Sequence, residues 1–316
     1  MIQTRMTSTV LAPFTARDGE NLALYEWPLA DWNSRLLDYR GTPPPPPRGV
    51  VLMVHGLGEH ACRYDHVAEK LMDWGFAVRA YDQRGHGESG GARGVLPSDT
   101  TLLDDLEEMI DDTRLRCQQL PQQRRVNGLA PKPLPLILLG HSLGGLVVSR
   151  FVSLNTRPVD GLVMSSPALD AGLSRWQKML LGIMPRLAPN LCIGNGLNAR
   201  YLSHDDEVVE KYRADRLVHD RISPRLGSFI ATAGPATVEA AAHWHTPTLL
   251  MYAGADRLVN PAGSRAFALR AAASPSVKPG TVSAACFERL YHEIFNEAET
   301  VPVFATLKGW LDARFK

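Results

Sequence analysis

The stretch LILLGHSLGG, residues 136–145, constrains the fold more than any other part of the chain. An apolar run leads into the five residues from Gly140 to Gly144, and the apolar-periodic segment LVVSRFV follows. G-x-S-x-G between a buried strand and a helix is typical of a nucleophile elbow, a strained turn that lifts the serine hydroxyl clear of a sheet. Cβ atoms at Gly140 and Gly144 would collide with the neighbouring strand and helix. The sequence therefore predicts that Ser142 is a nucleophile at the N-terminus of a helix, where backbone amides are available to an oxyanion.

Strand and helix patterns alternate along most of the chain. Buried strands are expected at residues 49–55, 76–81, 136–141, 159–165 and 248–253, with a further strand near 284–290. The apolar run VVLMV within 49–55 is unbroken, which is typical of a central parallel strand. Helical patterns lie between them and again over residues 300–315. This alternation predicts an α/β fold with a mostly parallel central sheet and helices on both faces.

The alternation breaks between residues 170 and 235, where helical pieces follow one another without a good strand. The simplest division is a core of residues 14–169 and 236–316, a helical cap (lid) inserted at 170–235, and a loosely held, flexible N-terminus of residues 1–13. The prolines from Pro43 to Pro47 and the segment 121–135 are expected to be surface loops.

Charge and cysteine content exclude several classes of function. Lys and Arg number 34 and Asp and Glu 33, so the net charge is +1 and no nucleic-acid partner is expected. The four cysteines are scattered without a C-x-x-C pair, so neither a disulfide framework nor a zinc site is expected. The N-terminus lacks the apolar stretch of a signal peptide, and no run of about 18 apolar residues predicts a transmembrane helix. We therefore expect a cytoplasmic protein with reduced cysteines.

A serine nucleophile needs a base to accept its proton and an acid to orient that base. Downstream of Ser142, Asp256 follows the apolar strand 248–253 and His292 follows the last strand. Loops at the carboxyl ends of strands are where open α/β sheets gather their sites. We therefore expect Ser142, Asp256 and His292 to form a catalytic triad, in the chain order that accompanies an elbow of this kind. Dehalogenase and epoxide hydrolase chemistry is disfavoured, because those enzymes use an aspartate nucleophile.

The tetrahedral intermediate of acyl transfer carries a negative oxygen, which needs preorganised N–H donors. The backbone amide of Leu143, directly after the nucleophile, is one expected donor. The other is the backbone amide of Leu57, which lies between two glycines after the strand 49–55. His55 is expected to brace this loop by hydrogen bonds rather than to react.

Five spaced motifs together resemble the monoacylglycerol lipase and lysophospholipase branch of the α/β-hydrolases. They are HGLGEH (55–60), YDQRGHGES (81–89), GHSLGG (140–145), Asp256 and LYHEIFNE (290–297), and the resemblance spans about residues 14–312. It implies an α/β-hydrolase fold and an enzyme that hydrolyses acyl esters of single-chain lipids without a cofactor or a metal ion. It also implies that Glu59 and Arg63 either lie near the polar head of the substrate or anchor their loop. The cap departs from the family, because Arg216 follows the cap aspartate where proline is usual.

Apolar residues recur at helical spacing through the first part of the expected cap. They are Leu173, Trp176, Met179, Leu180, Ile183, Met184 and Leu187, with Arg175, Lys178 and Arg186 alongside. The favoured interpretation is that this stripe packs on the core or lines an acyl-chain tunnel, with Trp176, Leu180, Ile183 and Met184 in the lining. The alternative is a helix that dips into a bilayer surface, which would give the protein a peripheral membrane contact.

The sequence therefore predicts a serine hydrolase of carboxylic esters, with monoacylglycerols as the expected substrates. A lysophospholipase, a short-chain carboxylesterase and an acyltransferase on the same fold stay as alternatives, because these motifs encode neither the acyl length nor the head group. A non-catalytic ligand-binding protein on a hydrolase fold is a remote alternative, since all three triad candidates are present. The oligomeric state is left open.

Overall fold

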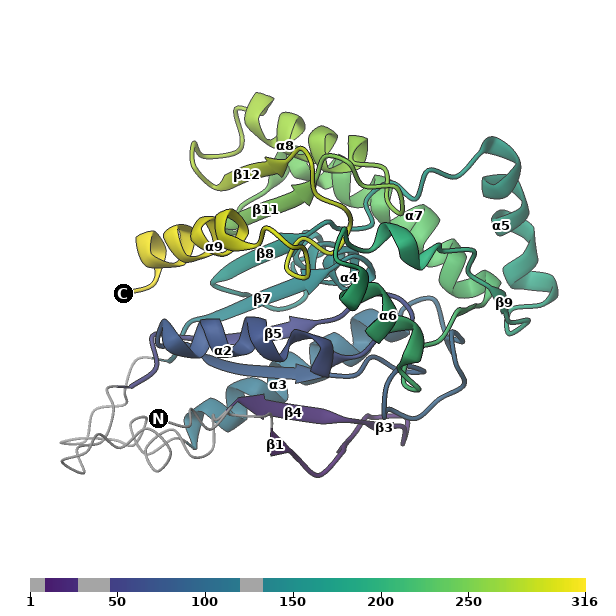
Figure 1. The fold of residues 1–316 in the computed structure, drawn as a ribbon, viewed down its shortest axis with the longest axis horizontal. Helices are drawn as coiled ribbons and strands as arrows, with labels where there is room; N and C mark the ends of the chain where they lie inside the picture. Colours follow the sequence, from purple (N-terminus) through teal and green to yellow (C-terminus); the bar gives the residue numbers. More distant parts are fainter. Residues whose placement is uncertain (1–8, 28–45, 120–132) are drawn as a thin grey trace.

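A computed structural model describes residues 9–27, 46–119 and 133–316 (Figure 1). Most of the proline run and of the loop expected at 121–135 lies outside these described residues. The centre of the molecule is an eight-stranded sheet with the order β1-β4-β6-β5-β7-β8-β11-β12. Its strands are β1 (Thr9–Val10), β4 (Leu24–Trp27), β5 (Val50–Val54), β6 (Ala77–Tyr81), β7 (Leu136–His141), β8 (Gly161–Ser165), β11 (Thr248–Ala253) and β12 (Val282–Phe287).

The six strands from β6 to β12 in this order run parallel, and β4 and β1 extend the sheet antiparallel at one edge. The expected mostly parallel sheet is thus confirmed. The register pairs Val54 of β5 with Gly140 of β7, and His141 of β7 with Ser165 of β8. The carboxyl ends of the central strands therefore meet at one edge of the sheet, and the loops that follow them lie side by side.

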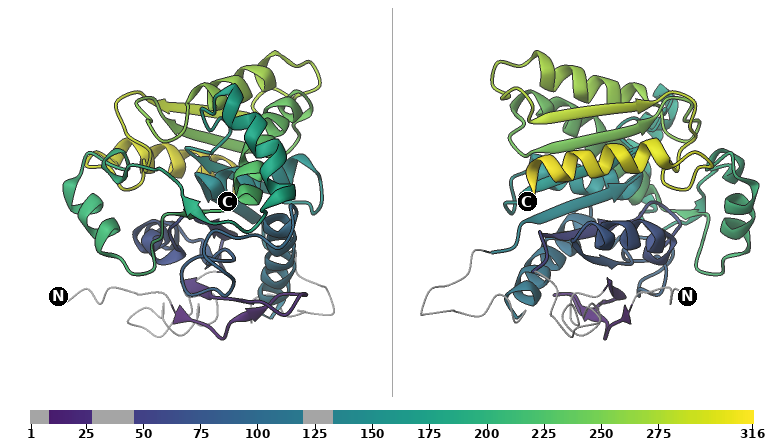
Figure 2. Two further views of the ribbon diagram at one scale, coloured as in Figure 1. Left: turned by 90° about the vertical axis from the view of Figure 1, so that its right-hand side faces the viewer. Right: turned by 60° about the vertical axis from the view of Figure 1, so that its left-hand side comes forward.

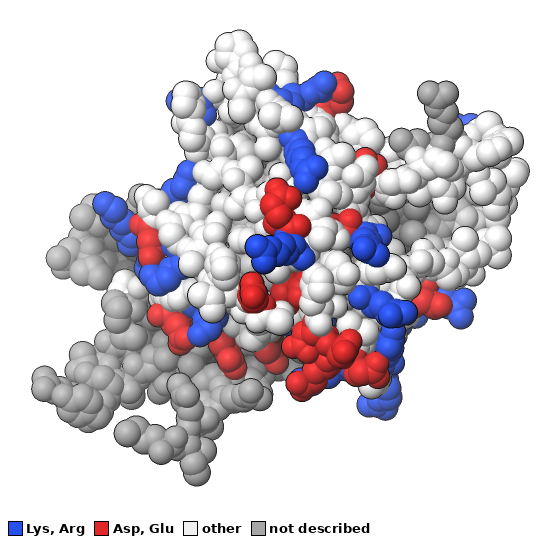
Figure 3. Space-filling model, turned by 45° about the horizontal axis from the view of Figure 1, so that its top comes forward, with Lys and Arg blue, Asp and Glu red and all other residues white. Residues whose placement is uncertain are grey.

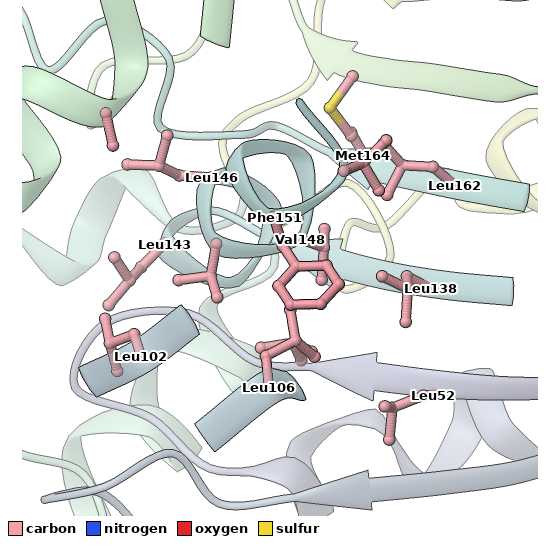
Figure 4. Close-up of a cluster of buried hydrophobic side chains, with 14 of the residues drawn as sticks. Leu52, Leu102, Leu106, Leu138, Leu143, Leu146, Val148, Phe151, Leu162 and Met164 are labelled. Atoms are coloured by element: carbon pink, nitrogen blue, oxygen red, sulfur yellow. The ribbon is translucent and has the colours of Figure 1, made fainter. Parts of the chain in front are cut away.

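Helices cover both faces of the sheet, because alternate side chains of a strand point to opposite sides. On β5, Leu52 packs in a cluster with residues from α3, α4, α7 and α8, whereas Val51 and Met53 pack with α2 and α9. Figure 1 shows α2 and α9 in front of the sheet, and Figure 4 shows Leu102, Leu106 and Phe151 of the first cluster near the strands. The covering helices are α2 (Asp65–Asp73), α3 (Thr101–Gln118), α4 (Leu143–Ser153), α8 (Ala262–Ala273) and α9 (Val301–Arg314).

Part of the N-terminal segment that was expected to be loose forms a strand. Within its described residues, Thr9 pairs with Glu26 and Val10 pairs with Tyr25 of β4. Strand β4 is an edge strand of the parallel core, and β1 satisfies backbone groups that would otherwise face solvent. A hairpin lies around Asp18, since β2 (Phe14–Thr15) pairs with β3 (Asn21–Leu22).

The cap elements lie beyond the carboxyl edge of the sheet (Figure 2). They comprise α5 (Arg175–Leu187), β9 (Ile193–Gly194), η3 (Ala199–Tyr201), α6 (Asp206–Ala214), β10 (Arg221–Ile222) and the start of α7 (Pro224–Ala240). Ser174 caps α5 with a complete capping box, and Ser223 followed by Pro224 begins α7. These start signals explain why both helices begin where they do.

Two details of the cap differ from the expectation. Strands β9 and β10 pair antiparallel, so the segment is not free of strands. The boundary expected at residue 235 falls inside α7, which packs against α5 of the cap and against α4 and α8 of the core. Pro235 does not end this helix. Because the single helix α7 belongs to both parts, the cap ends within the first part of α7, before the helix contacts the core. The division into core and cap is a proposal.

Candidate active site

Ser142 lies on the sharp turn between β7 and α4. Its backbone has φ 52° and ψ −116°, a left-handed conformation that costs energy for any residue except glycine. A Cβ on Gly140 would lie 2.4 Å from the carbonyl oxygen of Gly144, and a Cβ on Gly144 would lie 2.1 Å from that of Val54. Both glycines are therefore required for α4 to pack this close to β7 and β5. The geometry is that of a nucleophile elbow.

His292 and Asp256 come from the loops after β12 and β11. The Nδ1 atom of His292 lies 2.6 Å from Oδ2 of Asp256, and both side chains are buried. The other carboxylate oxygen of Asp256 accepts hydrogen bonds from the amides of Leu258 and Val259 at 2.8 and 2.9 Å. A carboxylate can only accept, so Nδ1 of His292 carries the proton and Nε2 is left with a lone pair.

Electrostatics make His292 a stronger base than an ordinary histidine. Burial lowers the pKa of His292, but the carboxylates of Asp256, Glu293 and Glu59 outweigh burial and raise the pKa above its usual 6.5. Burial raises the pKa of Asp256, and His292 with the two amides outweighs it, so the pKa of this carboxyl lies below its usual range. Asp256 is therefore ionised wherever His292 acts as a base.

Ser142 and His292 both line one pocket, together with Leu57 and Leu143. The structure thus brings all the expected reacting and oxyanion-binding residues except the buried Asp256 to the wall of the same cavity. Within the part of the chain that the structure describes, the Ser142 hydroxyl makes no hydrogen bond. Catalytic hydrogen bonds are often long in a protein without substrate and tighten when it binds.

Leu57 belongs to residues 55–60, which we call the oxyanion loop. The peptide that carries the Leu57 N–H also carries the carbonyl oxygen of Gly56, and Nδ1 of His55 donates to this oxygen at 2.8 Å. Nε2 of His55 accepts from the amide of Gln83 at 2.8 Å. Burial lowers the pKa of His55, so its ring is neutral and its tautomer is fixed by these two partners. His55 therefore orients the Leu57 amide, as the sequence predicts.

A buried cluster of charged side chains, Glu59, Arg63 and Glu293, anchors the oxyanion loop to the core. Glu59 accepts from the amide of Gly56 at 2.6 Å and from the hydroxyl of Tyr64 at 2.7 Å. Arg63 donates to Glu59 and also forms two hydrogen bonds to Glu293, at 2.7 and 2.8 Å. Burial raises the pKa of Glu59, but Arg63, His141, His55 and the hydrogen bond from Tyr64 together outweigh burial and lower the pKa to about 2. One guanidinium thus links the oxyanion loop to the residue that follows His292.

This placement favours the loop-anchoring alternative for Glu59 and Arg63. The two side chains are only 3% and 10% exposed, and neither lines the pocket at Ser142. A buried ion pair contributes little net stability against an apolar replacement, but removal of one partner leaves an uncompensated charge. We therefore assign the cluster of Glu59, Arg63 and Glu293 the role of fixing the position of the oxyanion loop.

Replacement of Glu59 by glutamine tests this assignment. We expect kcat to fall about tenfold and the free energy of unfolding to fall by about 1–3 kcal/mol, because an amide cannot replace a carboxylate that accepts three hydrogen bonds. Denaturant unfolding and steady-state kinetics measure the two effects, with Glu207→Gln on the exposed face of α6 as control. A raised KM with unchanged stability and kcat would instead indicate contact with the substrate head.

The pocket at Ser142 is a predominantly apolar cavity of about 350 Å³ that runs beneath the cap. Leu180 and Met184 of α5 line it, as expected. The other two residues expected in the lining do not: Trp176 is 73% exposed and Ile183 is 50% exposed. Helical spacing identifies which side chains share an apolar face, but it does not show what that face packs against. In α5 the apolar face is wide, so one side of it lines the cavity and the other side is exposed to solvent.

Several lining residues were missed by sequence reasoning. They are Leu181, Leu191, Ile193, Ile222, Gly227, Ile230, Leu258 and Val259. Leu181 has a detectable signal, since it is adjacent to the apolar stripe of α5. The residues of α7 have none, because nothing local in the sequence shows that this helix leaves the cap and crosses onto the core.

Fold and site together define an α/β-hydrolase with a serine nucleophile at the elbow. Residues 45–299 match the family described as serine aminopeptidase, S33. A monoacylglycerol lipase from Mycolicibacterium smegmatis is 35% identical over 85% of this chain and 90% of that lipase. Phospholipase YtpA from Bacillus subtilis is 29% identical over 84% of this chain and 96% of that protein. The crystal structure of the Paleococcus ferrophilus monoacylglycerol lipase superposes with a TM-score of 0.72 at 32% identity, over 85% of this chain and 96% of that one.

The chain belongs to the serine aminopeptidase S33 family of α/β-hydrolases, and within it to the monoacylglycerol lipase branch. The resemblance seen in the motifs is thereby confirmed, and so is the expectation of a serine hydrolase that acts on carboxylic esters. Within the described residues, no helix has both the length and the apolar character needed to cross a bilayer.

Proposed function

We propose that this protein hydrolyses monoacylglycerols through an acyl-enzyme on Ser142. The observation that carries the proposal is the apolar cavity that is lined by Ser142 and His292 together with residues of α5 and α7. A cavity lined in this way suits one flexible aliphatic chain, and Met184 in its wall adapts to such a chain. Relatives named as monoacylglycerol lipases support the same substrate class.

In the proposed mechanism, Nε2 of His292 takes the proton of Ser142 as Oγ attacks the ester carbonyl. The amides of Leu57 and Leu143 stabilise the negative oxygen of the tetrahedral intermediate. The ester C–O bond then breaks, and His292 returns its proton to the departing alcohol. A water molecule, deprotonated by His292, attacks the acyl carbonyl and releases the fatty acid, while Asp256 holds His292 in the required tautomer throughout.

A second hollow supports a neutral polyol as the leaving alcohol. It measures about 300 Å³ and shares Asn195, Leu197 and Leu258 with the acyl cavity. Its further lining is mixed: Ala199, Leu202 and Val218 are apolar, and the polar members are Tyr212, Arg213, Asp215, His219 and Asp220. The charged members are paired: Arg213 with Glu210, Asp215 with His60, and Asp220 with Arg221. Hydroxyl groups are therefore better suited to this hollow than a charged phosphate head.

Hydrolysis assays with matched substrates test the proposal. A monoacylglycerol should be cleaved with a kcat/KM at least about tenfold above that for a lysophosphatidylcholine of the same acyl chain, since an unpaired charge is costly to desolvate. An aminoacyl anilide, which the family description brings into question, should not be cleaved. Greater activity on the lysophospholipid or the anilide would overturn the substrate assignment. Added glycerol should not trap the acyl group, and efficient trapping would favour an acyltransferase.

Gly227 of α7 is expected to set the length of chain that the cavity accepts. A Cβ at this position would lie 3.0 Å from Cδ2 of Leu181, so any side chain narrows the cavity. Gly227→Val should lower kcat/KM for a long-chain monoacylglycerol about tenfold. The valine side chain would exclude about two methylene groups of the acyl chain from the cavity, and burial of each contributes about 0.8 kcal/mol. A short-chain ester should be cleaved within twofold of the wild-type rate. Gly182→Val, which points into open space on α5, is the matched control.

We also propose that the outer face of α5 contacts a lipid surface. Trp176, Met179, Ile183 and Leu187 are about half or more exposed, and Leu191 and Ile193 extend the apolar area. In Figure 3, the described side chains on this side of the molecule are mostly white, that is, neither basic nor acidic. Clustered exposed side chains of this size are typical of an interaction surface, and here the surface borders the cavity that would receive the lipid. The proposal keeps the sequence-based expectation of a cytoplasmic enzyme, with a peripheral contact.

Vesicle flotation tests the membrane contact. The double variant Trp176→Ser, Ile183→Ser should bind vesicles of phosphatidylcholine and phosphatidylglycerol at least about tenfold more weakly, because each side chain contributes about 1.5–3 kcal/mol when buried. Leu269→Ser, an equally exposed leucine on α8, is the control. Equal binding by both variants would show that α5 does not contact the bilayer.

A further inference from the structure

A segment of the cap lies directly across the oxyanion loop. We call residues 215–222 the strap; it follows α6 and ends with β10. The amide of His219 donates to the carbonyl oxygen of Gly58 at 2.9 Å. Gly58 has φ +76°, and a Cβ on it would lie 2.3 Å from the carbonyl oxygen of His219. The two backbones are thus in contact one residue away from Leu57.

A side-chain bond ties the other end of the oxyanion loop to the strap. Nε2 of His60 lies 2.8 Å from Oδ2 of Asp215, and His60 is only 5% exposed. Because the carboxylate can only accept, Nε2 of His60 donates this bond. Oδ1 of Asp215 accepts from the amide of Leu217 at 2.8 Å, which fixes the carboxylate at the point where the strap leaves α6.

The strap is itself fixed to the core beyond the oxyanion loop. The ring of His219 lies against that of His86, with 4.6 Å between centroids. The amide of Ser223, which follows the strap, donates to the carbonyl oxygen of Gly94 at 2.9 Å. A Cβ on Gly94 would lie 2.4 Å from the carbonyl oxygen of Arg221. The strap therefore has a defined position from which to hold the loop.

The contacts divide the support of the oxyanion loop between core and cap. The core holds its first half, through Gln83 on His55 and through Tyr64 and Arg63 on Glu59, and these two loop side chains in turn bind the carbonyl and the amide of Gly56. The cap holds its second half, through His219 on Gly58 and Asp215 on His60. Leu57 lies between the two supports. Its amide can stay aimed at the substrate oxygen only if both halves of the loop keep their places.

We infer that the strap is a positioning element of the oxyanion hole, so that the docked cap completes the catalytic apparatus as well as covering the acyl cavity. This inference rests on the proposed function, in which the Leu57 amide stabilises the oxyanion. Movement of the cap would then change the rate of the chemical step together with access to the cavity. A small displacement matters, since a shift of about 1 Å in a catalytic group costs up to about 10²-fold in rate.

Variants of Asp215 test the inference with a graded series. Asp215→Ala removes the acceptor for His60, whereas Asp215→Asn keeps an oxygen acceptor and should retain most of the activity. Glu207→Gln, which breaks an exposed ion pair on α6, is the matched control within the cap. Thermal unfolding of each variant shows that the protein tested is folded.

Two readouts distinguish positioning from a purely structural role. With p-nitrophenyl butyrate, Asp215→Ala should lower kcat about tenfold and leave KM within twofold, a part of the 10²–10³-fold loss expected when an oxyanion donor is removed. A trifluoromethyl ketone that forms a tetrahedral adduct with Ser142 should bind about tenfold more weakly, and the matching methyl ketone should bind equally well. Equal weakening of both ketones, or a raised KM with unchanged kcat, would overturn the inference.

Hydrogen exchange separates this inference from the proposed function, because it needs no catalysis. In Asp215→Ala, the amide of His219, which donates to Gly58 of the oxyanion loop, should exchange about tenfold faster than in Glu207→Gln. Unchanged exchange would show that the strap does not hold the loop, with the proposed function untouched. Faster exchange with an unchanged kcat would overturn both the inference and the role of Leu57.

Discussion

Replacement of Ser142 by alanine is expected to lower kcat/KM for ester hydrolysis at least about 10⁴-fold. The residue lies on the strained turn at the start of α4 and lines the same cavity as His292, the expected base, so its loss removes the attacking oxygen. Alanine fits the backbone at φ 52° no worse than serine, so the unfolding midpoint should stay the same. Steady-state hydrolysis of a monoacylglycerol and thermal unfolding measure the two effects.

The matched control is Ser153→Ala, at the far end of the same helix α4. This variant should hydrolyse the substrate at the wild-type rate, which excludes a general effect of changes in α4. A fluorophosphonate probe should label the wild type and Ser153→Ala but not Ser142→Ala. Labelling that persists in Ser142→Ala would assign the nucleophile to another residue and would contradict the proposed mechanism.

Replacement of Asp256 by asparagine is expected to lower kcat about 10⁴-fold, the loss typical when the triad acid becomes neutral. The amide can donate to Nδ1 of His292 and so favours the tautomer in which Nε2 carries the proton. That tautomer cannot accept the proton of Ser142. The charge is lost with little change in volume, so the packing around the 2.6 Å contact should survive.

The pH profile of kcat/KM tests the same replacement independently. His292 acts as a base only when neutral, so the wild-type rate should fall as the pH drops through a pKa above 6.5. Without the Asp256 carboxylate, burial lowers the pKa of His292, so the acid limb of the residual activity should move to lower pH. Asp312→Asn, on α9 and distant from the cavity, should keep the wild-type profile. An acid limb that does not move in Asp256→Asn would show that this carboxylate does not face the catalytic base.

The local parts of the site could be predicted because their signals are local. Gly140 and Gly144 are needed within a few residues of Ser142, so strand, turn and helix are readable from ten positions. Asp256 and His292 could be assigned because parallel strands place their carboxyl ends together. This argument needs only the order of the strands, which the apolar runs supply.

The parts that could not be predicted depend on contacts between distant segments. Arg63 meets Glu293 across 230 positions, and His60 meets Asp215 across 155. The sequence leaves the role of Glu59 and Arg63 undecided because ion pairs have no spacing rule outside a helix. The prediction of the cap residues that line the cavity was partly wrong for a different reason. The helical periodicity of α5 is correct, but its apolar face borders both the cavity and solvent, and Trp176 and Ile183 lie on the solvent side.

The most direct test of the central claim is kcat/KM for a series of monoacylglycerols of increasing acyl length, measured below their aggregation limits. If the acyl chain occupies the cavity at Ser142, kcat/KM should rise by up to about fourfold per methylene, the equivalent of about 0.8 kcal/mol, until the cavity is full. The rise should be absent from the residual activity of Ser142→Ala. Turnover confined to the shortest chains would contradict the account, since the cavity would then not hold a lipid chain during catalysis.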